Sequence, residues 1–343
     1  MDFGVVLHPH PLRSPPLARR AEELGFTHAW FPDTPVYTAD VYATMALAAK
    51  STATIRLGTQ VAVAPIRAAP VTVLSIATIN KLAPGRTVLG LGSGSLSLAM
   101  MGLPPVRIAE FRRYVQTTAG LIRDGEAPYE TGNLRTVVKL YSELGAFNLK
   151  DPIPLYIGAS APKAAVLAGE FGDGLITSAV TKPELIADLL RHAREGGQRA
   201  GRESGRSFFC SNETFMCVLR PGETLESERV LSIVGPYVRF WFWSWATNAI
   251  PPQEQLTPPV RRAFEAWKES VGIERCPPEK RLAALFHPGI GRYVTADVLQ
   301  AVCLLGTPAE LADRVRAFEA VGVTHMSVMS NVMDDVADLA SKL

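Results

Sequence analysis

The sequence predicts a closed (β/α)8 barrel of the TIM-barrel type, and two observations lead to this fold class. Short apolar runs alternate along the chain with amphipathic segments whose apolar residues recur at three- and four-residue spacing, the pattern of repeated βα units. Eight such runs occur, and a closed barrel would leave no exposed sheet edge at the short first and last runs. A doubly wound open sheet is the alternative fold.

The eight predicted strands are short and largely apolar. They cover residues 3–7, 27–31, 54–61, 87–91, 155–158, 174–177, 208–219 and 324–329. Gly25 is expected to end the first helix in a left-handed conformation, and Pro84-Gly85 is expected to close the helix before the fourth strand. These helix ends place the turns where a barrel needs them.

We expect one domain over residues 1–343, with two insertions that interrupt the βα rhythm. The first lies near 125–150, where alternation over residues 136–140 predicts a hairpin. The second lies near 246–300 and is rich in proline and charge. Both insertions are expected at the surface or over the barrel mouth.

Composition and charge narrow the classes of function. The chain has 47% hydrophobic residues, and 35 Lys and Arg are mixed with 33 Asp and Glu to a net charge of +2. Nucleic acid and membrane are therefore not expected as partners, and no apolar run is long enough to span a bilayer. The four cysteines lack the spacing of a zinc site or a disulfide framework, so no metal site and a cytoplasmic location are expected.

The segment 154–163 predicts an anion site. A strand here ends in small residues, and Pro162 opens the next helix, so backbone N–H groups would be left at a positive helix end. An ordinary βα loop is the alternative. The spacing is not that of a P-loop. Gly92-Ser-Gly94 is not a dinucleotide fingerprint either, because no third glycine follows and no helix is expected to open there.

Five segments in order carry a resemblance to a known family. They are 21–33, 57–61, 85–94, 156–174 and 306–314. Together they resemble the bacterial luciferase-like superfamily, and the fifth βα unit is most similar to its branch that uses the deazaflavin coenzyme F420. That branch includes methylenetetrahydromethanopterin reductase, secondary-alcohol dehydrogenase and a glucose-6-phosphate dehydrogenase. The resemblance implies the same barrel and a flavin-type cofactor.

The resemblance also implies a cofactor site. The implied binding residues are Asp33, Gln60, Val61, Ser93, Gly158, Ala159, Ser160, Ala161, Pro162, Thr177 and Ser178. Within this set the backbone of Ser160 and Ala161 would hold the cofactor phosphate, and Asp33 would lie near the deazaflavin ring. A cis peptide at Gln60-Val61 would form a bulge behind that ring.

Two departures from the family pattern bear on the reaction. Members that oxidise sugars or alcohols carry His after the aspartate and an acidic residue after Gly-x-Gly, where this chain has Thr34 and Ser95. Alcohol oxidation needs a base for the hydroxyl proton, and neither residue supplies one. A reductase is therefore favoured, in which a proton donor assists hydride delivery. His8 is the first candidate for that donor. Asp33 and Thr34 are the other residues expected to be catalytic.

Other residues leave alternatives open. His10 or Tyr37 could donate the proton, and His8 could instead be a hydrogen-bonded structural residue. Glu213, in the seventh strand, is either a polar contact to the cofactor or the partner of an arginine. The run 237–245 holds five Phe or Trp residues and could line an apolar pocket, form a subunit contact or belong to the core.

Three functions follow in order of preference. The first is hydride transfer from reduced coenzyme F420 to an unsaturated, apolar or aromatic small molecule. The second is an FMN-dependent monooxygenase of the same superfamily, and the third is a catalytically silent barrel that binds a flavin. The family resemblance also implies a homodimer.

Overall fold

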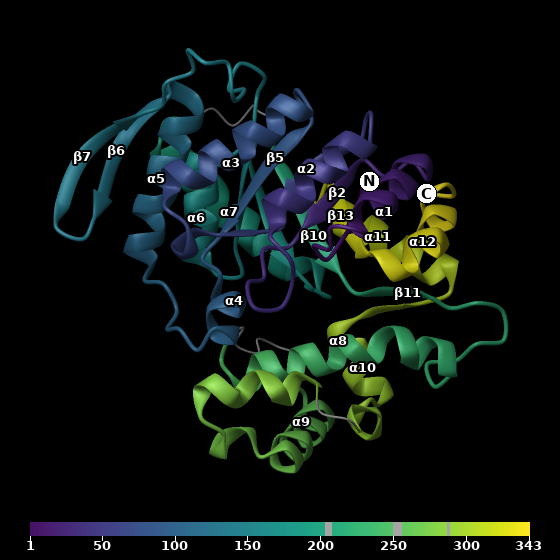
Figure 1. Cartoon of the computed structure of the whole chain (residues 1–343). Helices are drawn as coiled ribbons and strands as arrows, with labels where there is room; N and C mark the ends of the chain where they lie inside the picture. The colour runs from purple at the N-terminus through teal and green to yellow at the C-terminus, as the bar shows by residue number, and fades with distance from the viewer. Residues whose placement is uncertain (203–207, 250–255, 287–288) are drawn as a thin grey trace.

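The computed structural model describes residues 1–202, 208–249, 256–286 and 289–343. Within these residues, eight parallel strands form a closed barrel, because β3 pairs with β5 as well as with β2. In chain order the strands are β1 (Asp2–Val6), β2 (His28–Phe31), β3 (Arg56–Thr59), β5 (Thr87–Gly92), β8 (Leu155–Gly158), β9 (Gly174–Ser178), β10 (Phe209–Thr214) and β13 (His325–Met329). The predicted barrel is confirmed, and the open sheet is excluded (Figure 1).

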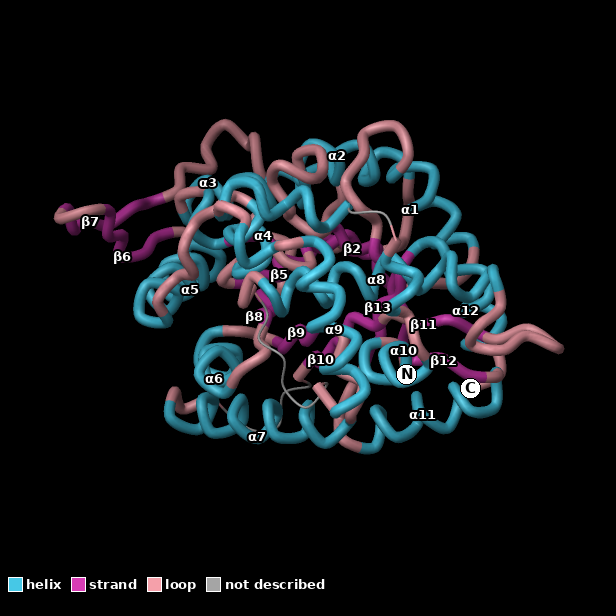
Figure 2. The backbone as a smooth tube through the Cα atoms, turned by 90° about the horizontal axis from the view of Figure 1, so that it is seen from below, coloured by secondary structure: helices cyan, strands magenta, loops and turns pink. Residues whose placement is uncertain are grey.

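Helices surround the strands (Figure 2). They are α1 (Ser14–Glu23), α2 (Val41–Ser51), α3 (Ala69–Leu82), α5 (Ile108–Asp124), α6 (Pro162–Phe171), α7 (Pro183–Arg199), α11 (Pro308–Ala320) and α12 (Met333–Ala340). Gly25 and Gly85 adopt positive φ angles of 83° and 69° at the two predicted helix ends. Among the described residues, no helix combines the length and apolarity needed to cross a bilayer.

The seventh predicted strand is corrected by the structure. Residues 208–219 form two strands, β10 in the barrel and β11 (Met216–Val218), which leaves the barrel and pairs with β12 (Leu304–Gly306). Phe215 separates them and is buried. The polar residues 211–214 give way to the apolar residues 215–219 at this break, but a strand-length pattern does not show that the hydrogen-bonding partner changes there.

A helical layer covers one end of the barrel (Figure 1). It consists of α8 (Glu228–Ala246), α9 (Pro258–Val271) and α10 (Ala296–Val302), which pack together in a second hydrophobic cluster. Most of the predicted second insertion belongs to this layer, although 250–255 and 287–288 lie outside the described residues.

The predicted hairpin in the first insertion is confirmed. Strands β6 (Glu126–Thr131) and β7 (Leu134–Lys139) pair antiparallel and project from the barrel near α5 (Figure 1). Gly132 lies in the turn with a positive φ of 57°. The hairpin lies away from the barrel mouth, so it does not contribute to the site described below.

Aromatic side chains fill the barrel interior near the amino-terminal ends of the strands. His28 stacks on Trp30 with 4.9 Å between ring centroids, and Tyr156 stacks on Phe209 at 4.3 Å. His325 is fully buried beside them and meets His28 edge-on. These rings fill the barrel interior at this level.

Two contacts separate this aromatic packing from the open end. A Cβ on Gly58 would stand 2.3 Å from a ring carbon of Trp30, so only glycine fits there. Above the rings, the amide nitrogen of Gln60 donates to the hydroxyl of Ser327 across the barrel at 2.8 Å. This bond closes the floor of the space at the carboxyl ends of the strands.

Candidate active site

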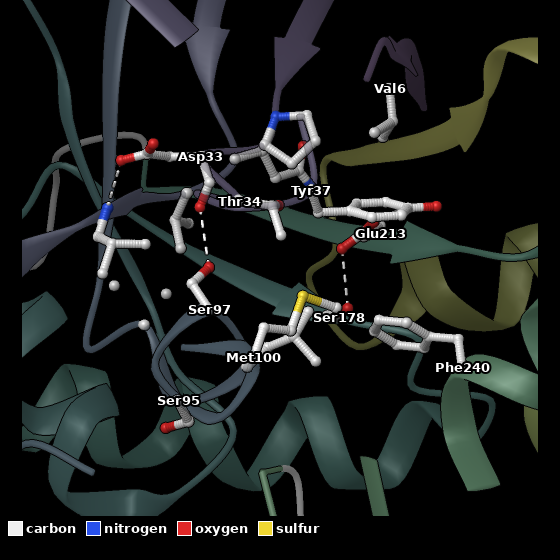
Figure 3. A pocket seen from close by; sticks show the side chains of 18 of the residues that line it. Val6, Asp33, Thr34, Tyr37, Ser95, Ser97, Met100, Ser178, Glu213 and Phe240 are labelled. Atoms are coloured by element: carbon white, nitrogen blue, oxygen red, sulfur yellow. Dashed lines mark hydrogen bonds between the residues drawn. The ribbon is translucent and has the colours of Figure 1, made fainter. Parts of the chain in front are cut away.

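A cavity of about 360 Å³ opens at the carboxyl ends of the strands. Loops after β1, β2, β3, β5 and β8 contribute to its lining, together with the ends of β9 and β10 and one face of α8. Figure 3 shows side chains from these elements facing a common space, with Met100 and Phe240 beside Glu213 and Ser178. The strand ends of a (β/α)8 barrel are where its active sites are built.

Most of the residues expected at the site line this cavity. They are His8, Asp33, Thr34, Gln60, Val61, Ser93, Gly158, Ala159, Ser160, Thr177 and Ser178. Ala161 and Pro162 do not line it and form the start of α6 instead. Ser95, the second position that departs from the family pattern, also lines it.

Asp33 is held by an ion pair rather than left open to a ligand. Its carboxylate accepts a hydrogen bond from the guanidinium of Arg67 and another from the backbone N–H of Val63 at 3.1 Å. The backbone carbonyl of Asp33 accepts from the hydroxyl of Ser97 (Figure 3). Asp33 is 5% exposed, so it connects the loop after β2 to the segment before α3.

The peptide between Gln60 and Val61 is cis, as the resemblance implied. It follows β3, and its two side chains take different directions. Gln60 reaches across the barrel to Ser327, while Val61 contributes an apolar surface to the cavity. The Oε1 atom of Gln60 is buried without a hydrogen-bond partner among the described residues.

The loop after β8 joins the cavity to the first turn of α6. The helix has Ala161 as its N-cap and Pro162 in its first turn, and no side chain caps it. Its terminal N–H groups are therefore not satisfied by a capping side chain, which is the arrangement that favours an anion. Gly158 has no side chain, and a Cβ there would stand 3.2 Å from Val61.

A carboxylic acid faces the cavity from β10. Glu213 is paired in register with Ser178 of β9, whose hydroxyl donates to Oε2 of Glu213 at 2.8 Å (Figure 3). Burial raises the pKa of Glu213, and the hydrogen bond from Ser178 opposes that rise. Of the two expectations for Glu213, an arginine partner is wrong, because its hydrogen bond goes to serine.

Thr177 is the neighbour of Ser178, and it is bound within the protein. Its hydroxyl donates to the carbonyl of Ser211 and to the side-chain oxygen of Asn212 at 3.0 Å. Only 1% of Thr177 is exposed, although it lines the cavity. The side chain therefore orients β9 against β10 and offers little to a ligand.

The two histidines of the first loop have different surroundings. His8 lines the cavity and meets Tyr37 edge-on, with 6.2 Å between ring centroids. Burial lowers the pKa of His8, which favours its neutral form. His10 does not line the cavity, and its Nδ1 accepts from the backbone N–H groups of Leu12 and Arg13. His10 is therefore a structural residue at the start of α1.

A short helix follows the Gly92-Ser-Gly94 segment, contrary to expectation. Helix α4 (Ser95–Met100) begins directly after Gly94, which has a positive φ of 74°. A Cβ on Gly94 would stand 2.2 Å from a methyl of Val63. The glycine thus allows close packing against β4 (Ala62–Val63), and its conformation permits the abrupt turn from β5 into α4.

Sequence reasoning left the run 237–245 open between pocket, subunit contact and core, and it singled out no residue of α8 as functional. Tyr237, Arg239 and Phe240 line the cavity, whereas Trp241 and Phe242 of the same run are buried in the helical layer. The aromatic run is therefore divided between pocket and core. An arginine within so apolar a run is the signal that could have indicated a functional face.

The family model of luciferase-like monooxygenases matches residues 9–325. The chain belongs to this family. It is 31% identical over 330 residues to 5,10-methylenetetrahydromethanopterin reductase of Methanolobus tindarius, which covers 95% of this chain and 93% of that protein. This luciferase-like protein thus matches the reductase over nearly the whole length of both chains.

Two further relatives are similar. An F420-dependent glucose-6-phosphate dehydrogenase of Nakamurella multipartita is 37% identical over 153 residues, which is 43% of this chain and 44% of that protein. The solved structure of coenzyme F420 dependent tetrahydromethanopterin reductase from Methanopyrus kandleri has a TM-score of 0.74 and 21% identity, covering 99% of this chain and 97% of that one. At 21% identity, the similarity to the solved structure shows a shared fold.

Proposed function

We propose that this luciferase-like protein is an oxidoreductase that uses coenzyme F420 to reduce an unsaturated small molecule. The observation that carries the proposal is the cavity at the strand ends, which combines an uncapped helix N-terminus, an apolar wall and a half-buried carboxylic acid. The name of the Methanolobus relative supports a reductase, and the name of the Nakamurella relative supports coenzyme F420 as the cofactor. A homodimer, a cytoplasmic location and a single domain stay predictions.

The residues present fit a deazaflavin. The N–H groups at the start of α6 suit its phosphate, and Gly158 leaves the approach to them open. Val61 offers an apolar surface for a planar ring, and the unpartnered Oε1 of Gln60 offers an acceptor at its edge. Ser93 and Ser178 add polar groups to the same lining.

When bound in its reduced form, coenzyme F420 supplies a hydride to the substrate, and the substrate also needs one proton. Glu213 is our candidate for the general acid. Its Oε2 accepts from Ser178, so the proton would be held on Oε1, and the raised pKa of Glu213 favours the protonated form. Leu96, Met100 and Phe240 exclude water from the same space.

His8 remains the second candidate for the proton donor. It reaches the cavity from β1, but burial lowers its pKa, and a neutral imidazole is a weaker acid than an imidazolium. Thr34 and Ser95 line the cavity where a base for alcohol oxidation would otherwise be expected, and neither takes up a proton in the ordinary pH range. Their presence favours reduction over alcohol oxidation.

A binding titration tests the cofactor. Purified protein is titrated with oxidised coenzyme F420 and, separately, with FMN, and cofactor fluorescence is followed. We expect saturable binding of coenzyme F420 at lower concentration than FMN. Preference for FMN, with oxygen consumption once the FMN is reduced, would instead support the monooxygenase. Binding of coenzyme F420 without turnover of any unsaturated compound would support a silent barrel.

Substitution of the proposed acid tests the mechanism. Glu213→Gln is expected to lower kcat by about a hundredfold or more, because the amide keeps the shape but donates no proton to the substrate. Wild-type kcat should fall as pH rises through the raised pKa of Glu213, and the variant should lose this limb of the profile. Glu269→Gln, on the exposed surface of α9, is the matched control.

A different result would assign the proton donor to His8. If Glu213→Gln retains kcat and the pH profile while His8→Asn loses both, the proton comes from His8. Cofactor binding measured in each variant separates loss of chemistry from loss of the site.

A further inference from the structure

A single arginine faces the cavity from the helical layer. Arg239 lies on α8 between Tyr237 and Phe240, and all three residues line the cavity. The same lining includes the apolar side chains of Phe215, Leu285 and Phe286. Among the described lining residues, Arg239 is the one that carries a permanent positive charge.

This guanidinium has no protein partner in the part of the chain that the structure describes. Its Nε atom is buried and makes no hydrogen bond there. Glu213 is an acidic residue of the same lining, but it bonds to Ser178 rather than to Arg239. A charged group in an apolar setting is costly unless it is paired, and arginines of this kind are ordinarily matched by an acid. The missing acid points to a ligand.

The position of Arg239 separates it from the expected phosphate site of the cofactor. The phosphate site follows β8. Helix α8 is attached elsewhere, because the hydroxyl of Tyr237 donates a hydrogen bond to Asn331, which follows β13. The strand order β13-β10-β9-β8 places two strands between these supports. An anion at Arg239 is therefore a different group from the one bound at the start of α6.

We propose that Arg239 binds a carboxylate of an otherwise apolar substrate. A guanidinium donates two parallel hydrogen bonds to a carboxylate, and one fixed positive charge matches one negative charge in a lining that offers no second cation among its described residues. Phe240 and Phe215 would contact the apolar body of the substrate. The inference deepens the proposed function, because it names the substrate class of that cavity.

Paired probes of equal shape test the inference without any turnover. The full-length protein is titrated calorimetrically with cinnamate and cinnamamide, and with benzoate and benzamide. We expect each carboxylate to bind about tenfold or more tightly than its amide, because a hydrogen-bonded charge pair is lost in the amide. Arg239→Gln should abolish this preference and leave amide binding unchanged.

Two further variants make the test specific. Arg239→Lys keeps the charge but not the paired donors, so part of the preference should remain. Arg262→Gln, on the exposed surface of α9, is the matched control and should retain the whole preference.

Several outcomes would overturn the inference. They are equal binding of both members of every pair, absence of binding by either carboxylate, or a preference that survives Arg239→Gln. Weaker coenzyme F420 binding in Arg239→Gln, with the probe preference intact, would assign the arginine to the cofactor instead. Because these titrations need no cofactor, failure of the coenzyme F420 proposal would leave the carboxylate result standing, and the two can be told apart.

Discussion

The two halves of the barrel interior differ in what fills them. Near the amino-terminal strand ends, large rings stack on one another, and glycines such as Gly58 make room for them. Near the carboxyl ends, loops of Gly, Ala and Ser leave a cavity of about 360 Å³. One closed sheet thus carries stability at one end and ligand binding at the other, and substitutions at the two ends should have different consequences.

The largest effect is expected from removing a ring at the packed end. Trp30 is 0% exposed, so Trp30→Ala should lower the free energy of unfolding by about 3–5 kcal/mol. Phe240→Ala, at the open end, should lower it much less because its ring already borders the cavity. Urea denaturation measures both, and equal losses would contradict the division between the two halves.

A matched pair of glycines gives a sharper contrast. In Gly58→Ala the new Cβ would overlap the ring of Trp30 at 2.3 Å, and we expect a loss of about 1–3 kcal/mol. In Gly158→Ala the nearest atom is a Val61 methyl at 3.2 Å, so stability should change little while cofactor affinity falls. Thermal unfolding and cofactor titration of both variants check this, and comparable destabilisation would be the opposing result.

The smallest expected effect is a loss of folding stability at low pH. Burial, assisted by the charge of Arg56, lowers the pKa of His28 from 6.5 to about 3. Since protonation then accompanies unfolding, the stability that neutral His28 contributes is present above pH 6.5 and is lost as pH falls from 6.5 toward 3.

We expect wild type to lose roughly 1 kcal/mol more than His28→Asn between pH 7 and pH 5.5. Asparagine is chosen because its amide can keep the hydrogen bond that Thr27 makes with Nδ1 of the ring. Unfolding free energies across this pH range provide the measurement, and identical slopes for the two proteins would argue against a neutral buried imidazole.

Much of the packed half was predictable, because periodic apolar runs report burial directly. The strands at 87–92 and 155–158 were found within a residue of their ends for this reason. The break at Phe215 was not found, although the polar residues 211–214 give way there to an apolar stretch, because the change of pairing partner depends on the distant strand β12.

The open half was predictable only where it lies on strand ends. Small residues after β5 and β8 indicated the mouth, and family resemblance implied the cis peptide at Gln60-Val61. The ion pair between Asp33 and Arg67 was not foreseen, because the two residues meet through the fold and no local pattern links them. The arginine of α8 was also missed, although its place within an apolar run was a local signal.

Helix α8 separates its two tasks by face. Trp241, Trp243 and Trp245 are buried and fix the helix to its layer, while Arg239 and Phe240 point to the mouth. Substitutions on the face of α8 that borders the cavity therefore need not disturb the packing of the three tryptophans. A lineage could acquire a new substrate by exchanging one or two side chains on a support that stays in place, without remodelling any loop.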